Sequence, residues 1–244
     1  MKQQFVETSN FERFMAGIAR LDGRGSSEAC ILLLTGEPGT GKTCVTDHYG
    51  SDVNAVYLEG VPGMSLSFVR DYLSRETNVY GRGKFEQYHN MVEFFRKSQF
   101  PIILDEAQHG LPVRAEVIEY LRRVAENAGV VLILVCHSSE KHRFAARGLE
   151  HISTRVSDVV ELKRATLDDC AAYLQQLCEV QEDAEIAAQV FKQSGGRYRL
   201  MANAAKTLET FAKAANKTAL ISTDVKALRL CEDAMTALKR EAKA

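Results

Sequence analysis

The order of apolar and polar residues along the chain predicts alternating strands and helices in its middle. Residues 29–35 form a continuous apolar run that ends at a glycine, which is typical of a strand buried on both faces. From there, apolar runs of strand length alternate with segments of helical periodicity. The expected elements after this run are residues 53–58, 66–75, 85–97, 101–104, 113–127, 130–136, 141–154 and 159–162. This alternation predicts a parallel sheet sandwiched between helices.

The two ends of the chain show helical periodicity only. Residues 9–21 predict a short amphipathic helix, because Ser9 and Glu12 have the spacing of a capping box. A linker rich in glycine and serine, residues 22–27, separates this helix from the first strand. After residue 162 the expected helices are 167–180, 184–193, 200–215 and 225–242. We therefore expect an α/β core over residues 1–163 and a small all-helical lid over residues 164–244.

Composition and charge restrict the classes of function. The chain has 244 residues, 45% of them hydrophobic and 26% charged, as in ordinary globular proteins. It lacks an apolar run of the ~18 residues that a membrane span needs, and its start lacks the apolar region of a secretory signal. We therefore expect a cytoplasmic protein without a membrane partner. A net charge of −1 means that any contact with DNA must come from a local basic patch.

The six cysteines form no close CxxC pair, and three of them lie in or beside apolar runs. Reduced, buried thiols are therefore expected.

A phosphate-binding motif follows the first expected strand. The residues from Gly36 to Thr43 read G-E-P-G-T-G-K-T and fit G-x-x-x-x-G-K-[ST] at every fixed position. Glycines let backbone N–H groups converge on phosphate oxygens, Lys42 suits the β- and γ-phosphates, and the Thr43 hydroxyl suits Mg²⁺. The residues expected to bind ATP here are Gly36, Glu37, Pro38, Gly39, Thr40, Gly41, Lys42, Thr43 and Cys44.

Two adjacent carboxylates end a later apolar strand, residues 101–104. Asp105 suits the second protein ligand of the magnesium shell, and Glu106 suits a residue that orients the attacking water. Considered alone, the two carboxylates could instead belong to an exposed acidic turn without a role in hydrolysis. Together with the phosphate-binding motif about 60 residues earlier, the pair predicts ATP hydrolysis.

Four further residues, at three places in the chain, are candidates for contacts with the γ-phosphate. A polar residue after strand 130–136 could sense it, with His137 as first choice and Ser138 as second. Arg155, before the last expected strand, could reach the nucleotide of a neighbouring subunit. Arg199 could contact the nucleotide from the lid. The alternatives are a structural histidine and arginines in surface salt bridges.

The chain resembles the AAA+ ATPases from the phosphate-binding strand to the lid. The run from Asp105 to Gln108, D-E-A-Q, with a helix that contains residues 117–122, resembles the transposition regulators typified by the phage Mu B protein, TnsC and TniB. The start at Phe5–Thr8 is similar to the same group. The resemblance implies an ATPase that forms a ring or filament on target DNA and delivers that DNA to a transposase, which stimulates hydrolysis.

About 28 residues precede the first strand, so the resemblance implies that the core itself binds DNA. The chain also resembles the secretion ATPase ExeA, but without the long C-terminal extension of that group, which favours the transposition interpretation. A helicase-loader-like nucleotide switch is the third interpretation.

DNA contacts require basic groups on loops that face the pore of an oligomer. Arg82 and Lys84, in a glycine-containing loop, are the first candidates, with Arg75 and Lys97 nearby in sequence. Solvated charges on a flexible loop are the alternative. Lys239, Arg240 and Lys243 could also reach a phosphate, although a charged chain end is usually only solvated. We see no base-reading motif and therefore expect binding to the duplex backbone without sequence preference.

Overall fold

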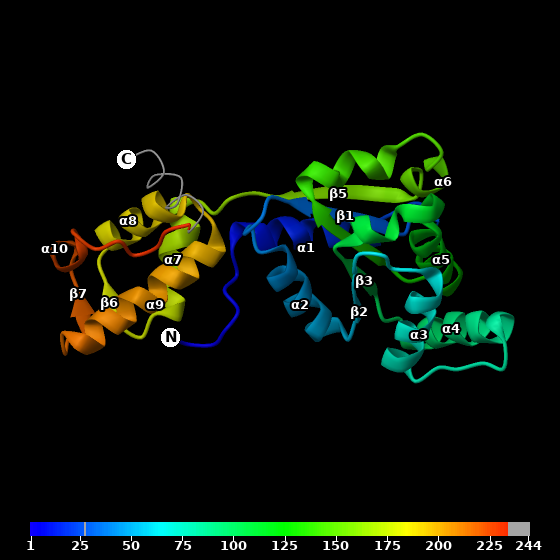
Figure 1. Ribbon diagram of the computed structural model, residues 1–244, viewed down its shortest axis with the longest axis horizontal. Helices are drawn as coiled ribbons and strands as arrows, with labels where there is room; N and C mark the ends of the chain where they lie inside the picture. The colour runs from blue at the N-terminus through cyan, green and yellow to red at the C-terminus, as the bar shows by residue number, and fades with distance from the viewer. Residues whose placement is uncertain (27, 234–244) are drawn as a thin grey trace. The chain divides into compact units, whose positions relative to one another are not determined.

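The computed structural model describes residues 1–26 and 28–233, and the chain divides into two compact units (Figure 1). We call the first the sheet unit; it comprises Arg13–Glu37 and Lys42–Leu162. We call the second the helical unit; it comprises Met1–Glu12, Pro38–Gly41 and the chain from Lys163 onward. The first helix and the phosphate-binding loop thus each contribute residues to both units.

The sheet unit contains five parallel strands in the order β2-β3-β4-β1-β5. Every residue of β1, which lies between β4 and β5, is buried, as the continuous apolar run predicts. The strands are β1 Ile31–Gly36, β2 Val56–Glu59, β3 Ile102–Asp105, β4 Leu132–His137 and β5 Val156–Leu162. Since all are parallel, their carboxyl ends lie along one edge of the sheet.

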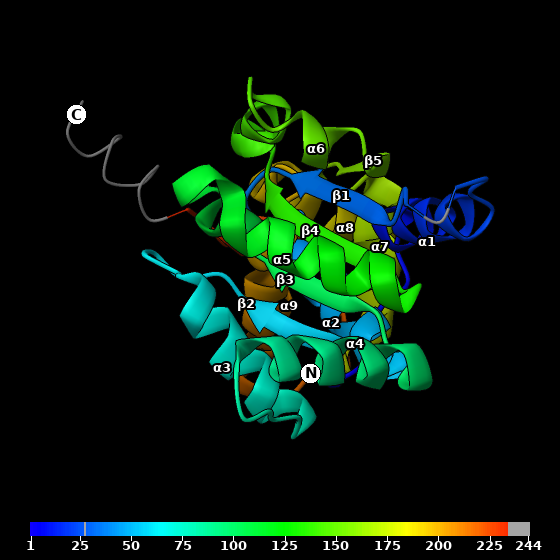
Figure 2. The same cartoon turned by 90° about the vertical axis from the view of Figure 1, so that its right-hand side faces the viewer.

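Helices cover both faces of this sheet. In Figure 2, α3, α4 and α5 lie on the side of the sheet that faces the viewer. Their apolar side chains form one core with Ile31 and Leu33 of β1. On the opposite face, Gly17 of α1 approaches Leu32, and Gly50 of α2 approaches Ile103. The helices are α1 Ser9–Asp22, α2 Lys42–Val53, α3 Leu66–Thr77, α4 Lys84–Ser98, α5 Pro112–Ala128 and α6 Glu150–Ser153, with 3₁₀ helices η1 Ala107–Gly110 and η2 Ser138–Ala145. The predicted α/β fold with helices on both sides of a parallel sheet is confirmed.

The helical unit is built mainly from three longer helices with a shared apolar core. A capping box between Thr166 and Asp169 begins α7, as the sequence predicts. Its elements are α7 Leu167–Leu177, β6 Gln181–Glu182, α8 Ala184–Ser194, α9 Tyr198–Ala214, β7 Ala219–Leu220 and α10 Ser222–Val225. The expectation of helices alone needs correction, because β6 and β7 pair as two short parallel strands.

Two expected helices are wrong in part. Residues 141–154 form no single helix: η2 ends at Ala145, and Gly148 adopts a φ of +89° before α6 begins. The last expected helix, 225–242, does not extend from Val225, where α10 ends. The Gln193 side chain accepts hydrogen bonds from the N–H groups of Leu230 and Cys231, at 2.8 and 3.3 Å, and so holds the chain outside a helix. Residues 234–244, which include Lys239, Arg240 and Lys243, lie outside the described residues.

All six cysteines are free, and five of them are buried, as expected for reduced thiols; Cys44 is exposed. Within residues 1–26 and 28–233, every helix is too short or too polar to cross a lipid bilayer.

Candidate nucleotide-binding site

The phosphate-binding loop connects the carboxyl end of β1 to the first turn of α2. Gly39 and Gly41 have φ values of +82° and +87°, which residues with a side chain rarely adopt. Lys42 begins α2, so the loop leads directly into a helix N-terminus. This strand, glycine loop and helix form the structural context in which the motif cradles phosphate groups.

Lys42 is held inside the loop. Its Nζ donates hydrogen bonds to the carbonyl oxygens of Gly36, at 3.0 Å, and Glu37, at 3.3 Å. The residue is 9% exposed, and burial lowers the pKa of its ammonium group, while the carboxylates of Glu106 and Asp105 oppose that shift. A buried cation satisfied by two loop carbonyls is placed to receive an anion at the loop.

Thr43 and Asp105 meet at the carboxyl edge of the sheet. The Thr43 Oγ1 donates to Oδ2 of Asp105 at 2.7 Å, although 62 positions separate the two in sequence. The Tyr57 hydroxyl of β2 donates to the same oxygen at 2.9 Å, which fixes the carboxylate from a second strand. A hydroxyl beside a buried carboxylate is a donor set that suits Mg²⁺ with bound phosphates. These two residues therefore fit the metal that the sequence implies.

Glu106 has an unusual backbone conformation next to this pair. Its φ is +48° and its ψ is 42°, and its N–H donates to the carboxylate of Asp105 at 2.8 Å. The carboxylate of Glu106 accepts a hydrogen bond from Nε2 of Gln108. Such a left-handed conformation at a non-glycine residue is frequent at functional sites. Gln108 thus orients the carboxylate that the sequence predicts to act on water.

His137 ends β4 and lies opposite Gly36 in the strand register. It lines a hollow of about 340 Å³ together with Gln108, His109 and Ser139. The adjacent Ser138 Oγ is buried without a hydrogen-bond partner among the described residues. Both candidates for the γ-phosphate contact therefore lie beside the start of the phosphate-binding loop.

Within the helical unit, the loop tip Pro38–Gly41 contacts the start of α9. The Tyr198 N–H donates to the carbonyl oxygen of Gly39 at 2.9 Å. A side chain at Gly39 would lie 3.5 Å from Cβ of Arg197, whose guanidinium pairs with Asp233 at 2.6 Å. The predicted lid residue Arg199 is exposed two positions later. Arg197, which sequence reasoning missed, is therefore the arginine that the fold places at the loop.

Asn10 is a second residue that the sequence pattern does not reveal. It is 1% exposed, and its Nδ2 donates to the carbonyl oxygens of Thr40 and Lys163, at 3.0 and 2.7 Å. Its Oδ1 accepts from the Lys163 N–H at 3.0 Å. One side-chain amide therefore links the loop tip to the segment that enters α7.

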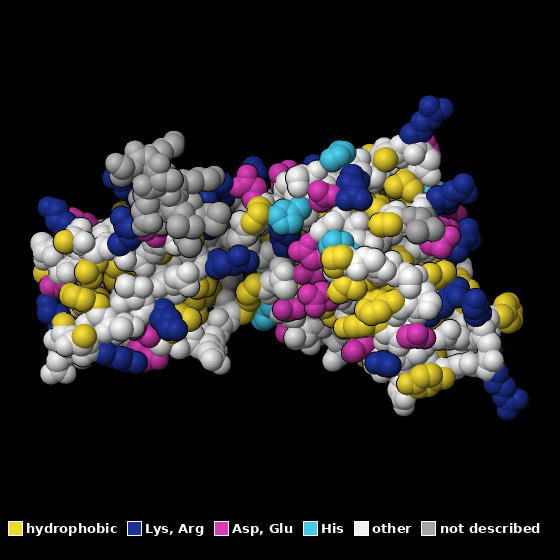
Figure 3. All heavy atoms as spheres, viewed as in Figure 1, with side chains coloured by type: hydrophobic (Ala, Val, Ile, Leu, Met, Phe, Trp, Pro, Cys, Tyr) yellow, Lys and Arg dark blue, Asp and Glu magenta, His cyan; other side chains and the backbone are white. Residues whose placement is uncertain are grey.

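The candidate DNA contacts fall into two places on the sheet unit. Arg75, Arg82 and Lys84 are exposed at or near the turn between α3 and α4. Figure 3 shows basic and hydrophobic side chains at the lower right, where Figure 1 places this turn. Lys97 lies 13 residues beyond Lys84 on α4, about 20 Å along the helix axis. The fold therefore groups three of the four candidates and separates Lys97.

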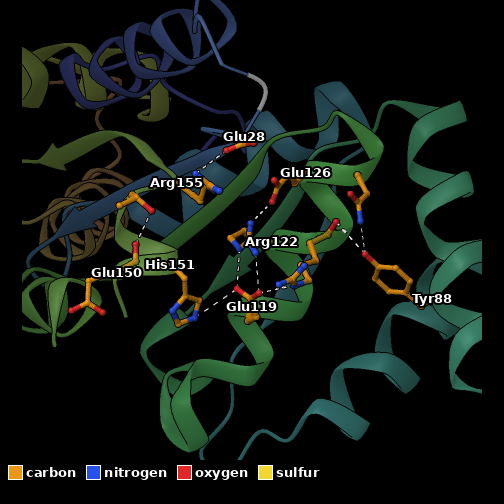
Figure 4. A network of polar contacts seen from close by, with 11 residues as sticks. Glu28, Tyr88, Glu119, Arg122, Glu126, Glu150, His151 and Arg155 are labelled. Carbon is orange, nitrogen blue, oxygen red and sulfur yellow. Dashed lines mark hydrogen bonds and ion pairs between the residues drawn. The ribbon is translucent and has the colours of Figure 1, made fainter. Parts of the chain in front are cut away.

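Arg155 lies at the opposite edge of the sheet from the phosphate-binding loop. Its carbonyl accepts a hydrogen bond from the N–H of Ile31, at the first residue of β1, at 3.1 Å. β1 spans about 16 Å from there to Gly36. The guanidinium points to Glu28 and pairs with it at 2.9 Å (Figure 4). Arg155 therefore cannot serve the loop of its own subunit.

The helix that carries part of the family resemblance contributes a buried arginine to this region. The side chain of Arg122 is 6% exposed and pairs with Glu119 at 2.9 Å and with Glu126 (Figure 4). Glu119 also accepts from Arg123 at 2.7 Å and lies 3.7 Å from His151. Arg122 is therefore a structural residue of α5, held between two carboxylates.

The chain is similar to known proteins in sequence and in structure. Residues 24–144 match the family model of an AAA domain. No curated protein matches the chain. The ORC2 protein of Aeropyrum pernix, in ADPNP-ADP complexes, superposes with a TM-score of 0.67 at 16% identity, covering 92% of this chain and 68% of that one. A single-residue variant of RuvB from Thermotoga maritima superposes with a TM-score of 0.62 at 15% identity, covering 91% and 68%. RuvB of the same organism, described as a Holliday junction branch migration motor, gives 0.58 at 17% identity, covering 91% and 68%. The chain is therefore similar to an AAA domain over residues 24–144 and has the AAA+ P-loop fold.

Proposed function

We propose that the chain is a magnesium-dependent ATPase that assembles on DNA without sequence preference and delivers that DNA to a transposase. The observation that carries the ATPase part is the convergence of Lys42, Thr43, Asp105 and Glu106 at one edge of the sheet. Phosphoryl transfer to water requires a loop that cradles the phosphates, ligands for the metal ion and a carboxylate that orients the water. The AAA domain match over residues 24–144 supports the same reaction.

The residues divide the work of hydrolysis among them. Lys42 exchanges its two loop carbonyls for phosphate oxygens, which its buried charge stabilises. Thr43 and Asp105 would hold Mg²⁺, which would neutralise charge on the bound phosphates. Glu106, oriented by Gln108, positions the attacking water. His137, which lies opposite Gly36 in the strand register, contacts the γ-phosphate.

Two arginines complete the proposed site. Arg197, rather than the exposed Arg199, contacts the nucleotide at the loop tip, because the first carbons of its side chain lie beside Gly39. Arg155 acts on the nucleotide of a neighbouring subunit, because it lies a strand length away from its own loop. A homo-oligomer, either a ring or a filament, is therefore part of the proposal.

The DNA part rests on the resemblance and on surface charge. The D-E-A-Q run at Asp105–Gln108 is similar to that of transposition regulators, and a neighbour by fold, RuvB, is described as a branch migration motor. Arg75, Arg82 and Lys84 supply grouped positive charge on a chain of net charge −1. A helicase-loader-like nucleotide switch is the second candidate, and the fold shared with an ORC2 protein in ADPNP-ADP complexes agrees with its nucleotide dependence.

The experiment that tests the proposal measures binding to unrelated duplexes with ATP, ADP or no nucleotide at several salt concentrations. We expect binding that requires ATP, weakens with salt and is equal for unrelated sequences, together with rings or filaments in electron micrographs. A protein that hydrolyses ATP but binds no DNA in any nucleotide state would overturn the DNA part. In that case a protein client, as for a loader or a secretion ATPase, becomes the function to test.

A further inference from the structure

The turn between α3 and α4 exposes aromatic side chains together with basic ones. Phe85 is 85% exposed and Tyr80 is 60% exposed, the two largest values among the large hydrophobic residues described. Arg82 and Lys84 lie between them in sequence and are also exposed. The lower right of Figure 3 shows such hydrophobic and basic side chains next to one another. This surface, which we call the aromatic turn, comprises residues 80–85.

The backbone of the aromatic turn is fixed, so these side chains are not exposed by disorder of the loop. Asn90 donates to the carbonyl oxygen of Tyr80 at 2.8 Å, and the Arg82 N–H donates to the carboxylate of Glu86 at 2.7 Å. At Gly81 an added Cβ would lie 2.3 Å from the backbone nitrogen of Gln87, so only glycine fits. The turn therefore presents its side chains from a defined platform.

The two helices that support the turn are also joined to each other close to it. Gln87 Nε2 of α4 donates to Ser74 Oγ of α3 at 2.8 Å. The Val79 N–H donates to the carbonyl of Ser74 at 3.2 Å. A ligand that covers the turn therefore meets a backbone that is already ordered, which lowers the entropy cost of binding.

The chemistry of the turn selects its ligand. An exposed ring flanked by two cations fits a polyanion with planar groups, because each base can stack on the ring while guanidinium and ammonium groups neutralise neighbouring phosphates. Glu86 is the nearest acidic residue in sequence, and its carboxylate already accepts the Arg82 N–H. Arg75, exposed in the last turn of α3, adds a third positive charge.

We propose that Phe85 of the aromatic turn stacks on bases of DNA that are unpaired or unstacked, with Arg82 and Lys84 on the flanking phosphates. This inference rests on the proposed DNA binding and adds a substrate class to it, namely duplexes with locally disrupted pairing. Bases in an intact duplex are already stacked, so a ring gains most where stacking is lost. A ring can stack on any of the four bases, which agrees with the proposed lack of sequence preference.

The test compares three probes that contain 2-aminopurine: a single strand, an intact duplex and a duplex with a short mismatched bubble. Affinity is measured with ATP over a range of salt concentrations, and stacking is measured by quenching of 2-aminopurine. We expect the wild type to prefer the bubble and to quench its fluorescence. Phe85→Ala should weaken bubble binding by about 5- to 150-fold, the range for one stacked base, and abolish quenching with the salt slope unchanged. Phe85→Trp should retain both.

Arg82→Ala with Lys84→Ala should give the complementary result. It should weaken binding to all three probes and reduce the salt slope by about two, one for each lost phosphate contact. Ile221→Ala, at a residue 55% exposed in the helical unit, and Lys206→Ala with Lys213→Ala are matched controls that should bind as the wild type does.

The outcomes separate this inference from the proposed function. If the wild type binds none of the probes, DNA binding itself fails. If the wild type binds DNA and Phe85→Ala binds and quenches equally, the stacking inference is overturned and DNA binding stands. If Phe85→Ala instead changes self-association in sedimentation without DNA, the aromatic turn is a contact between copies of the chain, which also overturns it.

Discussion

Substitution of Asn10 should reveal how strongly one amide holds the tip of the phosphate-binding loop. Asn10→Ala removes three hydrogen bonds, those to the carbonyl oxygens of Thr40 and Lys163 and that from the N–H of Lys163. Each hydrogen bond contributes about 1 kcal/mol, and a buried polar group left unpaired costs about 1–3 kcal/mol. Because Asn10 is 1% exposed, water cannot replace the amide without rearrangement. We expect a loss of about 3 kcal/mol in the free energy of unfolding of the helical unit.

Asn10→Asp gives a sharper test of the same geometry. At neutral pH its carboxylate would face the two carbonyl oxygens that the amide now satisfies, so this variant should be less stable than Asn10→Ala. Acidification protonates the carboxyl group and restores a donor, so the order of the two variants should reverse at low pH. The control is Asn203→Ala, an asparagine of α9 away from the loop tip that should have little effect.

Urea denaturation followed by circular dichroism measures these differences, and a fluorescent ATP analogue measures the effect on the loop. We expect the Kd for ATP to rise about tenfold in Asn10→Ala, equivalent to about 1.4 kcal/mol of lost preorganisation. If the free energy of unfolding changes by less than about 0.5 kcal/mol and the Kd is unchanged, the amide does not hold the loop and the reasoning is refuted.

Three other substitutions test the site and the fold. Glu106→Gln should retain ATP binding, lower turnover by about 100-fold or more and lengthen the lifetime of DNA complexes; turnover at the wild-type rate would exclude the water-orienting role. Arg155→Ala should lose about 1000-fold in turnover, measured by phosphate release, and regain it when mixed with Lys42→Ala subunits, which still carry Arg155; absence of complementation at every ratio would exclude action on a neighbour. Burial raises the pKa of Glu182 to about 7, so the stability that its protonated carboxyl provides is lost as the pH rises from its ordinary pKa of 4.5 through 7. Glu182→Gln should remove this pH dependence and be more stable than the wild type above pH 7 by at most about 3 kcal/mol. The free energy of unfolding, measured by urea denaturation at several pH values, would contradict this if it changed with pH equally in both proteins.

The parts of the site that follow strands directly could be predicted from the sequence. Gly36 to Thr43 and Asp105 with Glu106 are recognisable because an apolar run precedes each of them. Parallel strands bring both motifs to one edge, so the contact between Thr43 and Asp105 follows from the fold class. For these residues, the local sequence pattern and the topology of a parallel sheet are sufficient to predict the site.

Contacts that join distant segments without a motif could not be predicted. Asn10 bonds with Lys163 across 153 positions, and nothing in the residues around Asn10 indicates that its amide is buried. The choice between Arg197 and Arg199 depends on where α9 begins, and helix ends are the least certain part of a sequence pattern. The helix expected from residue 225 onward is not formed over the described residues 226–233, because side chains of α8 take over backbone hydrogen bonds there.

The distribution of the six thiols gives this chain a built-in reporter of nucleotide occupancy. All of them lie in the described part of the chain, and Cys44, the residue after Thr43, is the exposed one. A maleimide dye should therefore attach at Cys44 in the folded protein without removal of the other cysteines. ATP should slow that labelling, and donor and acceptor dyes on separate batches of protein would report subunit assembly by resonance energy transfer.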